Sequence, residues 1–266
     1  MDTSVFLEDL DAVTFREMVA SGEATVLLPV GSLEQHGPHL PLGTDTILSS
    51  RFAEGVARSM GALVAQPIAY GYKSQQKSGG GNHLPGTVSL DGASLIGVTR
   101  NLVKSFLGQG VRHVVIINGH FENYQFLYEG IDLALEELGI KPGDHQSVLL
   151  LSYWDFVSPD TLAQVYPAGF PGWEVEHGGV LETSLMLYLE PARVASDRVV
   201  DGPAAILPRF DRLPVVPSRT PATGCLSSAA GSSAAKGELL YGQIVLDLAA
   251  DLTSELKSIP TEVCGL

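Results

Sequence analysis

The chain contains little cysteine, few basic residues and no long hydrophobic run. Only two of its 266 residues are cysteines, Cys225 and Cys264, and they lie far apart and outside the motifs described below. Two such residues predict neither a disulfide framework nor a thiolate metal site, so we interpret both as structural. No uninterrupted apolar stretch approaches the ~20 residues that a bilayer span needs, so no membrane-spanning segment is expected.

Basic residues are also scarce, since 16 Lys and Arg stand against 30 Asp and Glu and leave a formal net charge of −14. This charge repels phosphate backbones and anionic lipids. It argues against nucleic-acid and membrane partners and favours a small neutral or cationic substrate. The first eight residues include no basic residue before an apolar run, unlike a secretory signal, and a cytoplasmic location is therefore expected.

Strand-like and helix-like segments alternate along the chain. Runs rich in Val, Ile and Leu predict buried parallel strands over residues 24–30, 62–66, 111–118 and 147–152. Apolar residues at helical spacing predict helices over residues 46–60, 93–107, 126–138 and 238–256. This alternation predicts an α/β three-layer sandwich, with a mostly parallel sheet covered by helices on both faces. We interpret residues 1–266 as a single catalytic domain.

Four long stretches lack a clear period and are rich in Gly, Pro and polar residues: 31–44, 69–90, 154–179 and 201–231. Loops of this length inside a domain are often functional. The last one is interpreted as a surface excursion or a subunit contact, because a predicted helix follows it.

Acidic and histidine residues follow two of the predicted strands directly. Glu34 and His36 come after the strand that ends at Val30, and His120 and Glu122 come after the strand that ends near residue 118. Ligands of open parallel sheets bind outside the carboxyl ends of the strands, so both pairs are expected at one site. Residues two apart in extended backbone project from one face, and each pair can therefore hold a cation.

Asp45 precedes a predicted helix and has two interpretations. A lone Asp at this place is usually a helix N-cap, and a lone His or Glu in a loop is usually solvated. Five ligand-type residues at matched spacing favour a metal site instead: Glu34, His36, Asp45, His120 and Glu122. The two oxygens of Asp45 suit it to bridge two ions about 3.5 Å apart. Imidazole and carboxylate ligands without thiolate favour zinc or manganese.

Both tryptophans belong to a third cluster, formed by Trp154, the Gly-rich segment 173–179 and Glu182. Their rings can stack on a flat or cationic substrate as part of a movable lid. His177 can transfer a proton because its usual pKa of about 6.5 lies near neutrality. The alternatives are that the tryptophans fill core space and that His177 makes a local hydrogen bond. Glu182 either orients His177 or starts a helix.

Three consecutive glycines follow Ser78 in the segment 72–83. The segment lacks the Gly-Lys-Ser/Thr pattern of a phosphate-binding loop. Glycines allow the backbone to approach a ligand closely, so this segment is predicted to contact the substrate.

Taken together, these segments resemble the creatininase family. The resemblance rests on Leu-Pro-Val-Gly-Ser-Leu-Glu-Gln-His-Gly at residues 28–37, on Asp45 and on Asn-Gly-His-Phe-Glu-Asn at residues 118–123, and it extends to segments 70–83, 152–156 and 176–179. It implies reversible conversion of creatinine to creatine, in which a water held by two divalent ions, Zn²⁺ or Mn²⁺, attacks the lactam carbonyl. It also implies a homohexamer.

The same resemblance implies roles for single residues. One ion would be held by Glu34, Asp45 and His120, and the other by His36, Asp45 and Glu122. His177 would be the acid/base residue, and Glu122 would also take part in catalysis. The expected substrate contacts are Ser78, Gly119, Phe121, Trp154, Trp173 and Glu174, with Glu182 in a supporting role.

Two of these residues differ from the pattern of close creatininases, which have tyrosine in place of Phe121 and aspartate in place of Glu174. The phenylalanine lacks a hydroxyl group, and the longer glutamate shifts its carboxylate by about an ångström, a displacement that can cost ~100-fold in rate. Two alternatives therefore stay open. One is hydrolysis of another small amide, formamide or peptide, and the other is a non-catalytic protein that binds metal and ligand.

Overall fold

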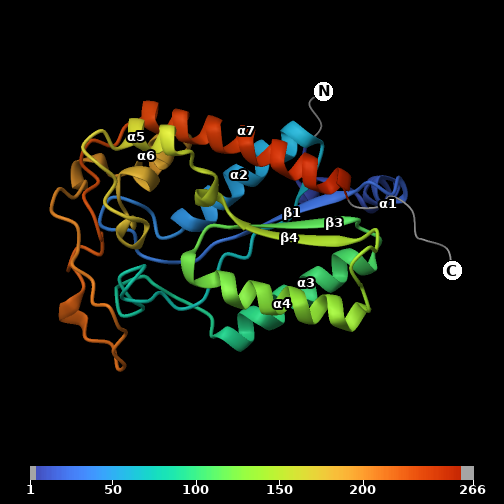
Figure 1. Ribbon diagram of the computed structural model, residues 1–266, viewed down its shortest axis with the longest axis horizontal. Helices are drawn as coiled ribbons and strands as arrows, with labels where there is room; N and C mark the ends of the chain where they lie inside the picture. Colours follow the sequence, from blue (N-terminus) through green and yellow to red (C-terminus); the bar gives the residue numbers. More distant parts are fainter. Residues whose placement is uncertain (1–3, 259–266) are drawn as a thin grey trace.

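A four-stranded parallel sheet forms the centre of the computed structural model, which describes residues 4–258 (Figure 1). The strands are β1 (Thr25–Val30), β2 (Leu63–Val64), β3 (His113–Asn118) and β4 (Ser147–Ser152). Their order across the sheet is β2-β1-β3-β4, and every neighbouring pair is parallel. Helices cover both faces of this sheet, which confirms the predicted three-layer α/β sandwich.

Different helices cover the two faces (Figure 1). One layer contains α2 (Thr44–Met60), α6 (Val180–Leu189) and α7 (Ala234–Ser258), and the other contains α3 (Gly92–Gly108) and α4 (Tyr124–Leu138). Successive strand residues point to opposite faces, so Leu27 packs in the core below α2 and α7, whereas Val26 and Leu28 pack in the core against α3. Both faces of the strands are therefore apolar.

Shorter elements complete the described chain. They are α1 (Ala12–Ala20), α5 (Pro159–Val165) and the 3₁₀ turns Leu7–Asp9, Phe121–Asn123, Tyr153–Phe156, Trp173–Val175, Pro191–Arg193, Ser196–Arg198 and Pro217–Arg219. None of the helices between residues 4 and 258 is both long and apolar enough to cross a membrane. Cys225 is a buried free thiol, and Cys264 lies outside the described residues.

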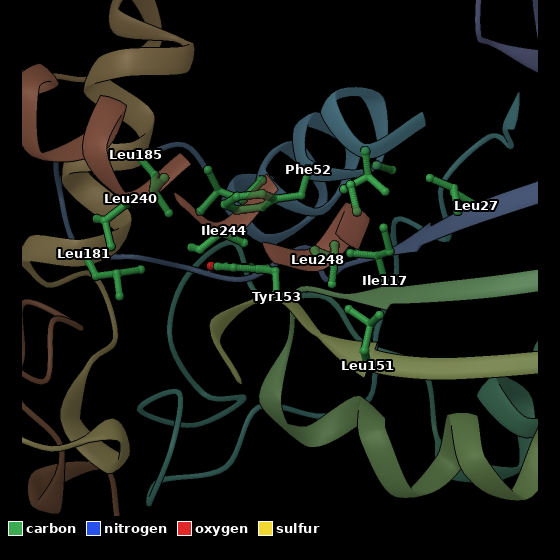
Figure 2. Packing of buried hydrophobic residues seen from close by; sticks show 14 of the residues in the cluster. Leu27, Phe52, Ile117, Leu151, Tyr153, Leu181, Leu185, Leu240, Ile244 and Leu248 are labelled. Carbon is green, nitrogen blue, oxygen red and sulfur yellow. The ribbon is translucent and has the colours of Figure 1, made fainter. Parts of the chain in front are cut away.

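The core below α2 and α7 extends to the carboxyl end of the sheet (Figure 2). Tyr153, directly after β4, stacks on Phe52 of α2 with 4.5 Å between ring centroids. Leu181 of α6 belongs to the same core. Burying side chains of this size stabilises the fold by about 1.5–3 kcal/mol each. The segments that follow the strand ends are therefore supported by a packed core.

The predicted elements lie close to the observed ones. The fourth strand has the predicted bounds, and the four predicted helices each lengthen by one to four residues at an end. The sequence predicted neither α1 nor α5, and for α6 it offered only a helix start at Glu182 as one of two alternatives. Seven of the ten residues of α6 are buried, and a helix buried on all sides lacks the apolar stripe on which the prediction depends.

Three strands end in one row of the sheet. Val30 of β1 pairs with Asn118 of β3, which in turn pairs with Ser152 of β4. Because β2 lies on the outer side of β1, the chain reverses its direction across the sheet between β1 and β3. Ligands of open α/β sheets bind at such a switch point. The loops that begin at Gly31 and Gly119 leave the sheet there.

Candidate metal and catalytic site

A cavity of about 290 Å³ lies beyond these strand ends. Every residue that the sequence assigned to the site lines it: Glu34, His36, Asp45, Ser78, Gly119, His120, Phe121, Glu122, Trp154, Trp173, Glu174, His177 and Glu182. They come from loops after β1, β3 and β4, from the Gly-rich segment 72–83, from the segment between α5 and α6 and from the first turns of α2 and α6. The fold thus brings all of them together around one space.

Asp45 lies between two imidazoles. Its Oδ1 atom is 2.8 Å from His36 Nε2, and its Oδ2 atom is 3.2 Å from His120 Nδ1. Helix α2 begins at Thr44 with Gly43 at the N-cap and without a side-chain cap. The N-cap interpretation of Asp45 is therefore wrong. Its buried carboxylate thus contacts both His36 and His120.

Asp45 forms the first group of potential metal ligands with Glu34 and His120. One ligand atom of each lies within 4.8 Å of the others, and all three residues are buried. Glu34 Oε2 is 2.9 Å from His120 Nδ1, whereas Glu34 Oε1 and Asp45 Oδ2 are buried and accept no well-aligned hydrogen bond from residues 4–258. Buried carboxylate oxygens without partners are unfavourable. These oxygen and nitrogen donors fit a divalent cation such as zinc or manganese.

His36, Asp45 and Glu182 form a second buried group within the same 4.8 Å limit. Glu182 Oε1 lies 3.5 Å from His36 Nε2, and Glu182 Oε2 accepts a hydrogen bond of 2.7 Å from the Gly178 amide. Glu182 does belong to the first turn of α6, but its carboxylate meets His36. Contact with His36 is a role that neither sequence interpretation of Glu182, orienting His177 or starting a helix, included.

Glu122 lies on the other side of His120. Its Oε2 atom is 3.3 Å from His120 Nε2, and its Oε1 atom accepts hydrogen bonds from the Gln75 amide, at 2.8 Å, and from the Ser78 hydroxyl. In this arrangement the carboxylate that groups with His36 and Asp45 is Glu182, whereas the family resemblance assigned Glu122 to that place.

The carboxylates draw positive charge into the site. Burial disfavours the charged form of His36, but Asp45 and Glu182 raise its pKa well above the usual value. Burial opposes the charged form of His120 in the same way, and Glu122 and Glu34 raise its pKa well above the usual value. The surroundings thus favour positive charge between the carboxylates, and a divalent cation would supply it.

His177 and both tryptophans also line the cavity. The His177 ring lies 4.3 Å from the His36 ring, and its Nε2 atom is 3.9 Å from Glu34 Oε1. Trp154 is half-buried and packs edge-on against Tyr153 at 5.2 Å, whereas Trp173 is 43% exposed. The core-filling alternative therefore does not describe Trp173, which presents its ring at the cavity.

A family model described as "Creatininase: Creatinine amidohydrolase" matches residues 8–252. The chain is 50% identical to the creatinine amidohydrolase of Pseudomonas putida over 256 residues, which cover 96% of this chain and 98% of that protein. The chain belongs to the creatininase family. Solved structures of creatininase Mn and of a glutamate-to-glutamine mutant creatininase of Zn-Zn type each superpose with a TM-score of 0.93 and 49% identity, covering 96% of this chain and 99% of theirs.

This creatininase-family cavity has further lining residues that the sequence analysis did not name singly: Lys77, Gly79, Tyr153, Glu176 and Leu181. Lys77 and Gly79 belong to the segment 72–83, which was predicted to contact the substrate. Glu176 precedes His177, and its Oε1 atom accepts hydrogen bonds from Tyr166 Oη at 2.6 Å and from the Leu181 amide at 2.7 Å. Burial and the charge of Glu182 raise the pKa of Glu176 to about 8.

Proposed function

We propose that this protein hydrolyses creatinine to creatine, reversibly, with two divalent metal ions at the base of its cavity. One observation carries the proposal: two buried groups of ligand-type side chains share Asp45 and lie in a cavity that also holds both tryptophans. The 50% identity to a creatinine amidohydrolase supports the choice of substrate.

The metal positions follow from the donor sets. Glu34, Asp45 and His120 would hold one ion. His36 and Asp45 would hold the other, with Glu182 as the third ligand that the geometry favours. Two ions at these positions would supply a nucleophile from water at neutral pH and polarise the substrate carbonyl. The Mn and Zn-Zn forms of the related structures support manganese or zinc.

The walls of the cavity suit a small flat ring. Trp154 and Trp173 line it together, and their faces attract a guanidinium-like group by stacking and cation–π interaction. Ser78 and the backbone amide of Gln75 hold the Glu122 carboxylate in place. The pocket thus combines aromatic surface with a fixed carboxylate, a combination suited to the planar guanidine part of creatinine.

His177 is the residue to which we assign the proton transfer. When the ring C–N bond of the lactam breaks, the leaving nitrogen needs a proton, and an imidazole on the cavity wall can give it. General acid catalysis of this kind contributes typically about 10²- to 10⁴-fold. The proximity of His177 to Glu34 and His36 supports this role, since the reacting carbonyl would lie beside the metal ligands.

The two departures from the family pattern lie at the cavity mouth. Phe121 is 63% exposed. The Glu174 carboxylate folds back over Gly172, where an added Cβ would lie 2.6 Å from its Oε2 atom. The longer side chain therefore occupies space beside a glycine. We expect creatinine to be accepted, with substrate affinity as the quantity that these two residues change.

The test is creatine formation from creatinine by the zinc- or manganese-loaded protein, with a chelated sample and Asp45→Asn as controls. Metal-dependent creatine formation that both controls lose is the expected result. If the folded, metal-loaded protein leaves creatinine intact but cleaves another small amide, that amide replaces creatinine as the proposed substrate. If the protein binds creatinine and metal but turns over no amide, the result supports the alternative of a non-catalytic binding protein.

Three further expectations accompany this proposal: a homohexamer, a cytoplasmic location and a single domain over residues 1–266. The first can be measured directly by sedimentation equilibrium of the metal-loaded protein.

A further inference from the structure

Gln35 stands between Glu34 and His36 and is itself 6% exposed. Its amide nitrogen Nε2 lies 3.1 Å from the carbonyl oxygen of Gly224 and 3.3 Å from that of Gly79. The same nitrogen is 3.2 Å from Nε2 of His177. Its Oε1 atom accepts a hydrogen bond of 2.9 Å from the Gly37 amide. One side chain thus connects four segments that are distant in sequence.

The number of hydrogen atoms on the Gln35 amide and the His177 ring decides which of these contacts are hydrogen bonds. An amide nitrogen has two hydrogens, yet three acceptor-type atoms surround Gln35 Nε2. His177 Nε2 also lies 2.8 Å from the backbone oxygen of Gln35, which can only accept. His177 Nε2 therefore carries a hydrogen and donates it to this oxygen. The two amide hydrogens of Gln35 then serve the carbonyls of Gly79 and Gly224, and no lone pair faces another.

This arrangement selects one nitrogen of His177 for the substrate. With the hydrogen on Nε2, the lone pair of the neutral ring is on Nδ1. Nδ1 makes no hydrogen bond within residues 4–258, and it is not among their buried atoms without a partner. It therefore keeps access to solvent, and His177 lines the cavity.

Two glycines leave room for the Gln35 amide. A Cβ atom at Gly224 would lie 1.7 Å from Gln35 Oε1, and one at Gly80 would lie 3.3 Å from Gln35 Nε2. Gly224 also has φ +83°, a conformation that favours glycine. A side chain at residue 224 would displace the amide, so the surroundings of Gln35 fit this one residue closely.

We propose that Gln35 is a positioning residue for His177. Its backbone oxygen holds the ring through Nε2–H, and its side-chain amide keeps the segments around Gly79 and Gly224 in place, so that Nδ1 exchanges the proton with the ring nitrogen of the substrate. The identity of that substrate rests on the proposed function, but the orientation of the ring does not.

The first test compares Gln35→Met, which has similar length but lacks the amide, with Gln146→Met. Gln146 is a matched control because its Nε2 atom also donates to two backbone carbonyls, Leu107 O at 2.9 Å and Val111 O at 2.8 Å, outside the catalytic cavity. We expect Gln35→Met to keep its bound zinc and to lose about tenfold or more in kcat, since displacement of a catalytic group by about 1 Å can cost ~100-fold. Gln146→Met should keep kcat within about twofold.

A double variant separates positioning from a general structural effect. If Gln35 acts through His177, adding Gln35→Met to His177→Ala should change kcat by less than about twofold, because coupled residues are not additive. Losses that multiply in the double variant, or equal losses in the Gln35 and Gln146 variants, would overturn the proposal.

The second test does not depend on activity. Nitrogen-15 NMR of the zinc-loaded wild-type protein, with His177 assigned by comparison with His177→Ala, should show hydrogen on Nε2 and a bare Nδ1 in the neutral ring. The backbone oxygen that accepts this hydrogen remains in Gln35→Met, so the hydrogen should stay on Nε2, but loss of the side-chain amide should make the Nε2–H signal exchange faster with solvent. Hydrogen on Nδ1 in the wild type, or an unchanged exchange rate in Gln35→Met, would contradict the assignment. If the wild-type protein forms no creatine, the proposed function fails. The NMR measurement does not depend on creatine formation and still tests the role of Gln35.

Discussion

The Nε2 atom of His36 lies 3.5 Å from the Oε1 atom of Glu182, in the first turn of α6. This pair suggests that Glu182 is a metal ligand. Glu182→Gln should therefore reduce the bound zinc from two ions per chain to about one, since an amide oxygen is a weaker ligand than a carboxylate. The amide oxygen can still accept the hydrogen bond from Gly178. Atomic absorption after dialysis measures the zinc.

Glu136→Gln, at an exposed position of α4, is the control for this change and should keep the wild-type zinc content. Two zinc ions retained by Glu182→Gln would show that Glu182 is not a ligand and would return that place to Glu122.

Removal of the metals should lower the thermal stability. A ligand that binds only the folded state at 100 times its Kd stabilises by about 2.7 kcal/mol, which for a chain of this size corresponds to about 5–10 °C in Tm. A chelator should therefore lower the Tm of the zinc-loaded protein by this amount in a thermal melt. The Tm of Asp45→Asn should not respond to chelator, because its carboxylate belongs to both ligand groups. An equal response in both proteins would argue against sites that share Asp45.

Trp173 should contribute to substrate binding. Its exposed ring lines the cavity, and loss of a stacking or cation–π contact of about 1.4 kcal/mol corresponds to tenfold in affinity. Trp173→Ala is expected to raise KM about tenfold, measured from initial rates. Tyr128→Ala removes a similarly exposed ring on α4 and should leave KM unchanged. An unchanged KM in Trp173→Ala would remove this residue from the binding site.

Gly79 should not tolerate a side chain. An added Cβ would lie 2.1 Å from Glu34 Oε1 and 2.6 Å from Ser74 Oγ. Gly79→Ala should therefore weaken zinc binding at least tenfold and destabilise the chain by about 1–3 kcal/mol. Zinc titration and urea unfolding measure the two effects.

Gly242→Ala is the matched control, because a Cβ there meets nothing within 4 Å and the residue lies inside α7. It should stabilise the chain by about 0.5–1 kcal/mol through helix propensity. Similar behaviour of the two variants would show that the space around Glu34 is not restricted.

Local patterns were sufficient to predict the framework of this protein. The three longer strands consist mainly of Val, Ile and Leu because both of their faces pack against helices. Glu34 and His120 follow such strands, and the carboxyl ends of parallel strands share one edge of the sheet, so their convergence could be expected. Side-chain chemistry at short spacing therefore determined where the site lies and which residue types compose it.

The sequence by itself thus determined the strands, the amphipathic helices and the ligand-type pairs, since each depends on neighbours along the chain. Only the tertiary structure decided which carboxylate meets His36, because Glu182 is carried by α6, a helix buried on nearly all sides that has no periodic signal. It also decided that Nε2 of His177 lies 2.8 Å from the backbone oxygen of Gln35, because contacts between distant segments are set by packing and register.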